Sequence, residues 1–491
     1  MNASTRGRLV RQQEADRTIS TEPLARAEPS DPAGAKAASG RVFGKNLASA
    51  SILALLIYIC GAGLTSIAQL LIARLVGTTS FGIFAYTMAW TTVLAYLSAL
   101  GFNVSLLRFV PAYNAIGRID LARGVIVFAL WRSLIAATLA GLVGACLVLI
   151  FSDHVDRELE ISLLFGMASV PLVTAYIVGA TLVRAFGGVI SALLPERIVR
   201  DALLLIIVGA AAWAGSWAMD ATLVMMAAVT SSAVTAGLAF STAIRLCPPA
   251  LREQPARSEA HEWWAAVPPI MIITGLDVFI SRTGVMLLGW SGDVRNAGIF
   301  AIGLNVALLV GLSRLAISIM FAPTAAHLHA CGDREGLQRL FGRASVLCFA
   351  SATAMAVPLL LIVEPLLKLF GDDFVAAAPI TRILILGYVF ASLWGPQQNL
   401  LTMTGNEWLA AKAMIAGAGT NILGGTIGVI AYGPIGAALG VTFALVVWHS
   451  AMALYVYRRL KILPGLAYTA LAFKRSLQEG ATRPAPRPGQ S

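Results

Sequence analysis

The sequence predicts an all-α polytopic membrane protein with about twelve transmembrane helices in two parallel six-helix lobes. Three observations predict it: an apolar composition, a series of long apolar stretches and an internal repeat. The 491 residues are 58% hydrophobic and 12% charged, with a mean hydropathy of +0.78. A soluble protein of this length could not bury so much apolar surface, so we expect a bilayer to solvate it.

The apolar stretches are long enough to cross a bilayer one by one. A hydrocarbon core of about 30 Å needs roughly 20 apolar residues in a helix. The stretches are continuously apolar instead of alternating, which favours helices over the strands of a β-barrel. The predicted spans lie near 47–73, 82–107, 124–151, 161–183, 198–216, 221–244, 264–289, 298–320, 344–364, 379–403, 411–432 and 435–457.

An internal repeat relates two of these spans. The tetrad Gly-Ile-Phe-Ala occurs at 82–85 and again at 298–301, 216 positions later. Each copy opens an apolar stretch that ends on Phe-x-Pro, at 109–111 and 321–323, before a glycine and a charged run. The offset contains six spans, an even number, which predicts a parallel duplication around a central cavity. Similar helices under the same bilayer constraint are the alternative explanation.

The repeat also predicts the organisation of the chain. Residues 47–245 form the N-terminal lobe and 263–458 the C-terminal lobe, joined by a polar cytoplasmic linker at 246–262. Residues 1–46 mix charges with Pro, Ser, Ala and Gly without an apolar core, which is typical of a disordered cytoplasmic tail and not of a signal peptide. The second tail, 459–491, carries an apolar patch that is too short to span and is expected at the membrane interface.

The basic residues indicate an orientation. The net charge is +11, but the cations are dispersed among the helix connections, which excludes a nucleic-acid-binding patch. The loops after the second, fourth, sixth and eighth spans carry three arginines each, whereas the opposite loops hold fewer cations and most loop carboxylates. By the positive-inside rule both termini are cytoplasmic. The five cysteines have no paired spacing and are expected to be free thiols.

Several segments together resemble a known family of transporters. The segments are IARLVGTTSFGIFAYTMAW at 72–90, RFVP at 108–111, AGIFAIGLN at 297–305, APTAAHLHACGDREGLQRLF at 322–341, EPLLKLFGDDF at 364–374 and the polar run 397–399. They are similar to those of oligosaccharide flippases, such as O-antigen translocases, in the multidrug, oligosaccharidyl-lipid and polysaccharide exporter superfamily. The similarity extends over most of 47–458, and no single motif in it is diagnostic.

The resemblance implies a fold like that of the multidrug exporters of this superfamily. It implies a flippase in the bacterial inner membrane that moves a polyprenyl-diphosphate-linked oligosaccharide from the cytoplasmic to the outer leaflet by alternating access. The expected partners are this lipid-linked oligosaccharide, membrane lipids and a glycan polymerase with its export machinery. No cofactor is expected, and a coupling proton or sodium ion is an open possibility. A multidrug or ion antiporter and a lipid II flippase are the nearest alternatives.

Intramembrane charges are candidates for the mechanism, because each costs about 2.5–3.5 kcal/mol to insert. Arg314 has the small or weakly polar neighbours Ala307, Gly311 and Ser318 on its helix face, which leaves room for a ligand. Its guanidinium suits a diphosphate or sugar hydroxyls. The alternative is a structural arginine that bonds to helix carbonyls or reaches the cytoplasmic edge.

Asp277 and Arg282 are the next candidates and lie five residues apart, so about 140° of helix rotation separates them. Many of the related flippases carry an acid where this chain has Gly284, seven residues after Asp277. Asp277 is therefore a candidate to replace that acid as a proton or sodium site, or to neutralise a nearby arginine. We expect Arg314, Arg282 and Asp277 to face one cleft between the lobes.

Two further candidates are weaker. Gln397 follows Pro396, which can bend the tenth span, and its amide suits sugar hydroxyls or contacts between helices. Arg132 lies about 12 Å inside the third span, where ligand binding and snorkelling to the interface are both open. The charged run 196–201 is interpreted as solvated i,i+4 pairing at a cytoplasmic helix start.

The sequence also argues against other functions. Gly44-Lys45-Asn46 lacks the upstream glycine and the Ser or Thr of a nucleotide-binding P-loop, so ATP coupling within this chain is not predicted. His327 and Cys331 share a helix face without further ligands, so no metal site is predicted. No Asp-x-Asp motif and no long loop for glycosyl transfer occur, so no enzymatic activity is expected and a membrane glycan polymerase or ligase is a minor alternative.

Overall fold

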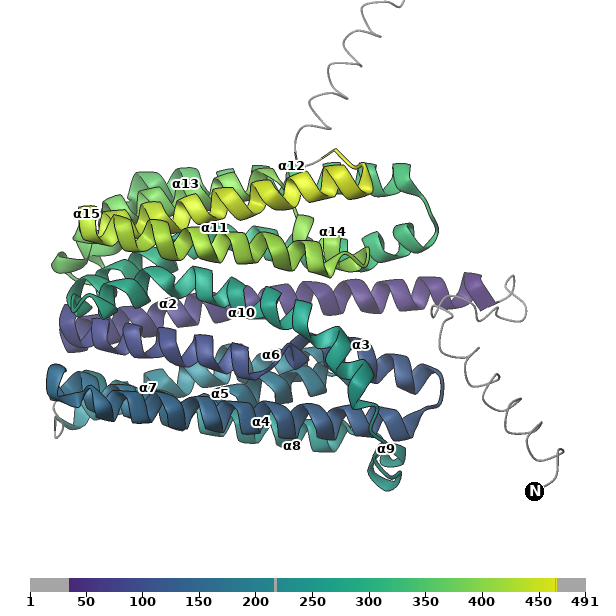
Figure 1. The fold of residues 1–491 in the computed structure, drawn as a ribbon, viewed down its shortest axis with the longest axis horizontal. Coiled ribbons are helices and arrows are strands. Elements are labelled where there is room, and N and C mark those ends of the chain that lie inside the picture. The colour runs from purple at the N-terminus through teal and green to yellow at the C-terminus, as the bar shows by residue number, and fades with distance from the viewer. Residues whose placement is uncertain (1–34, 216–218, 464, 466–491) are drawn as a thin grey trace, which may run out of the picture. The chain divides into compact units, whose positions relative to one another are not determined.

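The computed structural model describes residues 35–215, 219–463 and 465 (Figure 1). Most of the two predicted tails and nearly all of the apolar patch at 465–473 lie outside these residues. Met1–Ala50 and Ser51–Ser491 form two separate units, and every contact given below lies within the second. The described residues are helical with short connections and contain no strand, which confirms the predicted all-α class.

The helices follow the predicted apolar stretches along the chain. The α-helices are α2 (Ala35–Ser98), α3 (Phe102–Ala115), α4 (Ile119–Ile150), α5 (Arg157–Ala185), α6 (Val189–Leu194), α7 (Arg200–Ala214), α8 (Ala221–Leu246), α9 (Pro249–Glu253), α10 (Ala260–Trp290), α11 (Val294–Ala330), α12 (Arg334–Lys368), α13 (Ala378–Leu393), α14 (Gln397–Met403) and α15 (Glu407–Tyr455). Four shorter helical segments adjoin these α-helices. They are the 3₁₀ helices η1 (Ser152–His154) and η3 (Asp372–Ala377) and the π-helical turns η2 (Pro195–Val199) and η4 (Val456–Leu460).

Glycines divide the two longest helices into separate membrane passes. Among the described residues, 9 helices are long and apolar enough to cross a membrane. Gly77 in α2 and Gly433 in α15 have non-helical backbone angles, so these two helices hold two passes each. The run of α6, η2 and α7 covers 189–214 and supplies the pass predicted near 198–216. Together they give the twelve predicted passes.

The tenth predicted span is broken, as the proline in it indicated. α13 ends at Leu393 and α14 begins at Gln397, directly after Pro396. Gly395 between them has φ +66°, and a Cβ atom there would lie 2.9 Å from Cα of Ser345. Only glycine fits this turn, because it must combine a left-handed backbone with close approach to α12. The break places the polar run 397–399 at the start of a new helix.

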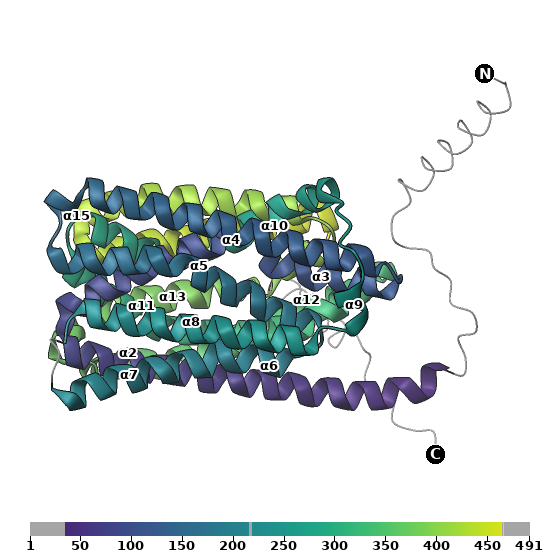
Figure 2. The ribbon, with the colours of Figure 1, turned by 90° about the horizontal axis from the view of Figure 1, so that it is seen from below.

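The helices pack into two bundles (Figures 1 and 2). In the first, α5 packs on α4 and α8, with α3 and α7 beside them; in the second, α10 packs on α15, and α11 packs on α12 and α13. Figure 1 shows α4, α5, α7 and α8 below and α11 to α15 above, and Figure 2 shows the bundles from below. The two-lobe arrangement is the predicted one, while the proposed lobe boundaries at 245 and 263 stay predictions.

The polar connection at 246–262 packs on the first bundle. Its short helix α9 contacts α4, and the Arg257 amide donates to the Asp120 carbonyl over 3.1 Å. Trp263 at the start of α10 is fully buried, and its indole donates to the Tyr113 hydroxyl over 3.1 Å. These contacts fix the start of α10 beside α3 and α4.

Candidate functional site

A cavity of about 340 Å³ lies between helices of the two bundles. α2, α5, α8 and the η2–α7 run line one side, and α10 and α11 line the other. The ionisable acidic and basic side chains in its lining are Glu196, Arg197, Arg200, Asp201 and Arg282. We call it the interbundle cavity. Its wall carries three cations and two carboxylates, an unusual density of charge for a membrane-spanning region.

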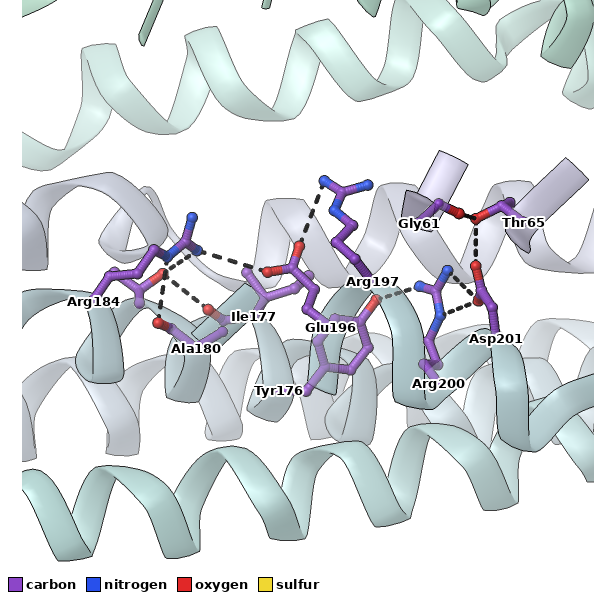
Figure 3. Close-up of polar contacts among 11 residues, drawn as sticks. Gly61, Thr65, Tyr176, Ile177, Ala180, Arg184, Glu196, Arg197, Arg200 and Asp201 are labelled. Atoms are coloured by element: carbon purple, nitrogen blue, oxygen red, sulfur yellow. Dashed lines mark hydrogen bonds and ion pairs between the residues drawn. The ribbon is translucent and has the colours of Figure 1, made fainter. Parts of the chain in front are cut away.

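Arg200 and Asp201 form the most completely bonded part of this wall (Figure 3). Arg200 Nε donates to Asp201 Oδ1 over 2.8 Å, and Arg200 Nη1 donates to the Tyr176 hydroxyl over 3.1 Å. The Thr65 hydroxyl of α2 donates to the other carboxylate oxygen of Asp201. Asp201 is only 3% exposed, so it neutralises Arg200 and fixes its position rather than offering a free carboxylate.

The neighbouring charges are held more loosely. Glu196 lies between two arginines: its Oε1 is 3.6 Å from Arg197 Nη2, and its Oε2 is 4.0 Å from Arg184 Nη2 (Figure 3). The Arg197 guanidinium also lies 4.8 Å from the centre of the Tyr58 ring. These distances exceed those of a strong ion pair, so the cations keep donors for another partner.

The interpretation of 196–201 as solvated i,i+4 pairing is wrong. The pairs observed are Arg200 with Asp201 and Arg197 with Glu196, and they lie inside the bundle. The π-helical turn η2 changes the register of this run, and Gly61 lets α2 approach it: a Cβ atom there would lie 2.8 Å from Arg197 Cβ. The sequence signal for this inward-facing run was Pro195 followed by four charged residues at the start of an apolar stretch.

Arg282 of α10 faces the η2 charges from the other bundle. It lines the interbundle cavity, and Arg200 is close enough to act on it electrostatically. Within the described part of the chain, Arg282 has no hydrogen bond or ion pair of its own. Arg282 is therefore an uncompensated cation at the wall of the cavity, and its binding role stays a prediction.

The two bundles meet directly at one end of the cavity. This end, which we call the Gly77 end, contains the turn at Gly77 and the start of α11, which pack together through Gly82 and Val294. A Cβ atom on Gly82 would overlap the Val294 carbonyl oxygen, and one on Gly298 would lie 2.8 Å from the Gly82 Cα. The two copies of the repeated tetrad therefore pack against each other through their glycines.

Other contacts extend this seam between the bundles. The Phe81 and Phe374 rings meet edge to face with centroids 5.8 Å apart. The Arg74 guanidinium donates to the Leu369 carbonyl, and the amides of Gln69 and Asn305 are bonded to each other across the cavity wall. The cavity is thus closed by protein contacts at the Gly77 end.

A second, smaller cavity of about 190 Å³ lies within the C-terminal bundle. Arg314 of α11, Gln397 of α14 and His449 of α15 line it, together with Trp448. Arg314 Nη1 and His449 Nε2 lie 2.9 Å apart, and Gln397 Nε2 donates to the His449 carbonyl over 2.8 Å. The structure thus brings two predicted residues together around a histidine that the sequence analysis missed, which we call the His449 cavity.

The ring of His449 has a defined pattern of hydrogen bonds. Its Nδ1 lies 2.9 Å from the Leu445 carbonyl, which can only accept, so Nδ1 carries a hydrogen. The guanidinium of Arg314 can only donate, so Nε2 must be unprotonated and accept from it. Both bonds exist together only when the imidazole is neutral. The sequence signal for this site was a histidine within an apolar span, because a polar ring inside the membrane needs hydrogen-bond partners.

Arg314 and Arg282 do not share one cavity. Arg282 lines the interbundle cavity, and Arg314 lines the His449 cavity. Asp277 and Arg132 occur in neither lining, and both side chains are exposed. The Arg132 guanidinium carbon lies 5.4 Å from the centre of the Phe128 ring, and the neighbouring Trp131 is exposed. This placement agrees with the alternative interpretation of Arg132 as a residue at the membrane interface. The binding roles of these residues stay predictions.

The position of the missing family acid is closed. Gly284 is buried, and a Cβ atom on it would overlap the ring of Phe300, a residue of the second Gly-Ile-Phe-Ala tetrad. Asp277, two turns earlier on α10, is exposed. The two positions therefore lie in different environments, although their spacing predicted a common face.

Comparisons with known proteins agree with this architecture. Residues 47–252 match the family model described as "Polysaccharide biosynthesis protein". A structure described as the inward-facing conformation of a multidrug resistance MATE family transporter of the MOP superfamily aligns with a TM-score of 0.67 at 14% identity, covering 82% of this chain and 94% of that chain. The chain has the MATE fold. The predicted fold is thereby confirmed.

The MATE fold of this chain is shared with a flippase of known structure. The lipid II flippase MurJ, in an inward closed conformation, aligns with a TM-score of 0.58 at 15% identity, covering 82% of this chain and 87% of that chain. The outward-facing conformation of a MATE transporter of the MOP superfamily gives a TM-score of 0.63 at 14% identity, covering 83% and 94%. No curated protein sequence matches the chain significantly.

Proposed function

We propose that this chain is a flippase that moves a polyprenyl-diphosphate-linked oligosaccharide from the cytoplasmic to the outer leaflet of the bacterial inner membrane. The match of 47–252 to polysaccharide biosynthesis proteins and the fold shared with a lipid II flippase and MATE transporters support it. Both termini would be cytoplasmic, and the Gly77 end would face outward. A glycan polymerase and its export machinery are the proposed protein partners.

The observation that carries the proposal is Arg282, an uncompensated cation at the wall of a cavity between two bundles. An unpaired charge in a membrane-spanning region costs several kcal/mol, so its retention calls for an anionic partner that is present only part of the time. A diphosphate is such a partner, because a guanidinium presents parallel donors to its oxygens. Arg197 across the cavity adds a second, loosely held guanidinium.

The remaining lining suits sugars rather than lipid. Gln69, Ser231, Ser232 and Asn305 present amide and hydroxyl groups to the cavity. A sugar that crosses the hydrocarbon region needs such partners, since each unpaired polar group costs several kcal/mol. The polyprenyl chain would stay in the bilayer while the head group passes between the bundles. Closure at the Gly77 end would alternate with closure at the opposite end as the bundles rock.

A second candidate is a multidrug antiporter that binds organic cations. It is favoured by the aromatic side chains of Phe81, Phe84, Tyr96 and Tyr176 in the lining, because aromatic faces attract cations. The two candidates differ in what they require of Arg282. A diphosphate needs its charge, whereas an organic cation would bind better without it.

The test replaces Arg282 in cells that lack their own oligosaccharide flippase and depend on this chain for surface glycan. We expect Arg282→Ala to lower glycan export about tenfold or more, since a hydrogen bond to a charged group contributes about 1.5–3 kcal/mol. Arg282→Lys should restore part of it. Arg334→Ala, which removes an exposed cation on α12, is the matched control.

Purified protein in liposomes separates the two candidates. The probe is a polyprenyl-diphosphate-linked N-acetylglucosamine, whose movement between leaflets is measured by its accessibility to a membrane-impermeant reagent. Movement by the wild type and its loss in Arg282→Ala support the flippase. Full movement with Ala at 282 would overturn the role of Arg282, and drug-dependent ion exchange without movement of the probe would identify an antiporter.

A further inference from the structure

The Arg314–His449 pair lies in the His449 cavity, apart from the charges of the interbundle cavity. Three elements meet there: α11 supplies Arg314, α15 supplies His449, and α14 supplies Gln397. His449 is 1% exposed, yet its ring lines a cavity of about 190 Å³, large enough for water molecules. The cavity is partly open and includes polar side chains in its lining, so it provides a local route for a proton to the ring.

A proton and the Arg314 contact compete for the same atom. The Nε2 lone pair of His449 accepts from Arg314 Nη1 over 2.9 Å, while Nδ1–H donates to the Leu445 carbonyl over 2.9 Å. A proton on Nε2 would turn this acceptor into a donor that faces another donor, and would place an imidazolium beside a guanidinium. The hydrogen bond would break and the two cations would repel each other.

We propose that His449 Nε2 is a proton-binding site whose occupancy releases the Arg314 guanidinium into the His449 cavity. The step is a protonation: the N–H bond forms at Nε2, the Arg314–His449 hydrogen bond breaks, and the Nδ1–H bond to Leu445 remains. The freed guanidinium then offers its donors to an anionic group. Proton binding at His449 and anion binding at Arg314 would therefore favour each other. Only the identity of the anion, the diphosphate of the substrate, rests on the proposed function.

The surroundings of the pair allow this exchange. Among the described residues, the other titratable groups that face it act on Arg314: Asp277 from α10, Tyr388 from α13 and Cys348 from α12. α14 contributes amides and no ionisable group. Asp277 is a carboxylate close enough to attract the released guanidinium, and an anionic ligand would compete with it.

Two polar side chains beside the pair have an atom without a hydrogen-bond partner. Gln397 is 1% exposed, and its Oε1 has no hydrogen-bond partner within the described part of the chain; the same holds for the buried Trp448 Nε1. Both residues line the same cavity as Arg314. One acceptor and one donor without a partner therefore belong to residues that line the same cavity as the releasable cation, and a small rotation of either side chain would present them to a ligand.

The direct test observes the ring itself. Full-length protein labelled with ¹⁵N in its histidines is titrated in lipid nanodiscs from about pH 8 to pH 5, the range in which histidine changes charge. The His449 signals are assigned by their loss in His449→Gln, with the exposed His329→Gln as the matched control. We expect the neutral Nδ1–H form over most of this range and an imidazolium only towards its acid end, because burial and the Arg314 guanidinium both disfavour the charged ring.

The second variant separates a proton site from a structural histidine. Arg314→Gln removes the competing cation, so the imidazolium should appear about one pH unit or more higher than in the wild type. A His449 ring that stays neutral over the whole range in both proteins would overturn the inference. An equal midpoint in wild type and Arg314→Gln would overturn the competition between proton and guanidinium.

Transport in liposomes then shows whether the proton matters for function. With the polyprenyl-diphosphate-linked N-acetylglucosamine probe, movement by the wild type should respond to a pH gradient, and movement by His449→Gln should not. A wild type that titrates but does not move the probe would fail the proposed function and leave the proton site standing. Movement that responds equally to the gradient in both proteins would overturn the coupling.

Discussion

Gly82 and Gly298, the first residues of the two repeated tetrads, pack against each other so closely that a Cβ atom on Gly298 would lie 2.8 Å from the Gly82 Cα. The contact joins α2 to α11 and therefore one bundle to the other. The repeated tetrad has a structural role, because it supplies a small residue to both sides of the contact between the bundles. The seam closes the Gly77 end of the interbundle cavity.

The first prediction concerns this seam. Gly82→Ala and Gly298→Ala should each separate the bundles at the Gly77 end, because the added methyl group overlaps backbone atoms that cannot move aside. We expect a loss of about 1–3 kcal/mol in the stability of the closed form, the usual range for overpacking. The measurement is the distance between spin labels at 153 and 373 in a cysteine-free background, which should lengthen.

The control for the seam is Gly237→Ala on α8. A Cβ atom at Gly237 meets nothing within 4 Å, so alanine should be neutral or slightly stabilising there. An unchanged label distance in both seam variants would show that the Gly82–Gly298 contact does not hold this end closed.

The second prediction concerns the pair Arg200 and Asp201. Asp201→Ala should destabilise the folded protein by about 3 kcal/mol, because it leaves the half-buried Arg200 without its buried carboxylate partner. The double variant Arg200→Met with Asp201→Leu should recover much of the loss. The measurement is the unfolding temperature in detergent.

Asp372→Ala is the matched control for this pair. Asp372 Oδ1 lies 3.8 Å from Lys368 Nζ, and both side chains are exposed. An exposed ion pair contributes about 0–1 kcal/mol to the free energy of unfolding. If Asp201→Ala and Asp372→Ala unfold at the same temperature, the network in Figure 3 does not stabilise the fold.

The third prediction explains the absence of an acid at Gly284. Gly284→Ala and Phe300→Ala should each destabilise the protein, the first by overlap with the ring and the second by leaving a cavity. The double variant should be about 1–3 kcal/mol more stable than the sum of the two single effects predicts. The alanine at 284 would fill part of the space that the Phe300 ring leaves, and removal of the ring would remove the overlap. Additive unfolding free energies would show that Phe300 does not occupy the space of a side chain at 284.

The fourth prediction concerns Arg314. Arg314→Ala should lower surface glycan export in the complemented strain, and Arg314→Lys should restore part of it, since lysine keeps the charge without the planar fork. Arg343→Ala, at an exposed position on α12, should leave export unchanged. Each variant is first checked for membrane insertion. Export at the wild-type level with Ala at 314 would remove Arg314 from the mechanism.

Much of the fold follows from local sequence. The apolar stretches located the helices, although several helices extend about ten residues beyond the predicted spans. Location is local because membrane crossing depends on the length of an apolar run and not on distant contacts. The divisions at Gly77, Gly433 and Pro396 were foreseeable for the same reason, because helix breakers act on their own backbone. The same reasoning about charges in apolar spans singled out Arg282, which lines the interbundle cavity, and Asp277, which does not.

The sequence by itself determined where the chain crosses the membrane and which two spans share the Gly-Ile-Phe-Ala tetrad, whereas only the tertiary structure decided which side chains meet. His449 lies 135 positions from Arg314, and no periodicity relates them. The run 196–201 was misjudged because a π-helical turn and the approach of Gly61 turned its charges inward. The rotation of each helix about its axis is set by the fit of its neighbours, which a single apolar stretch does not encode.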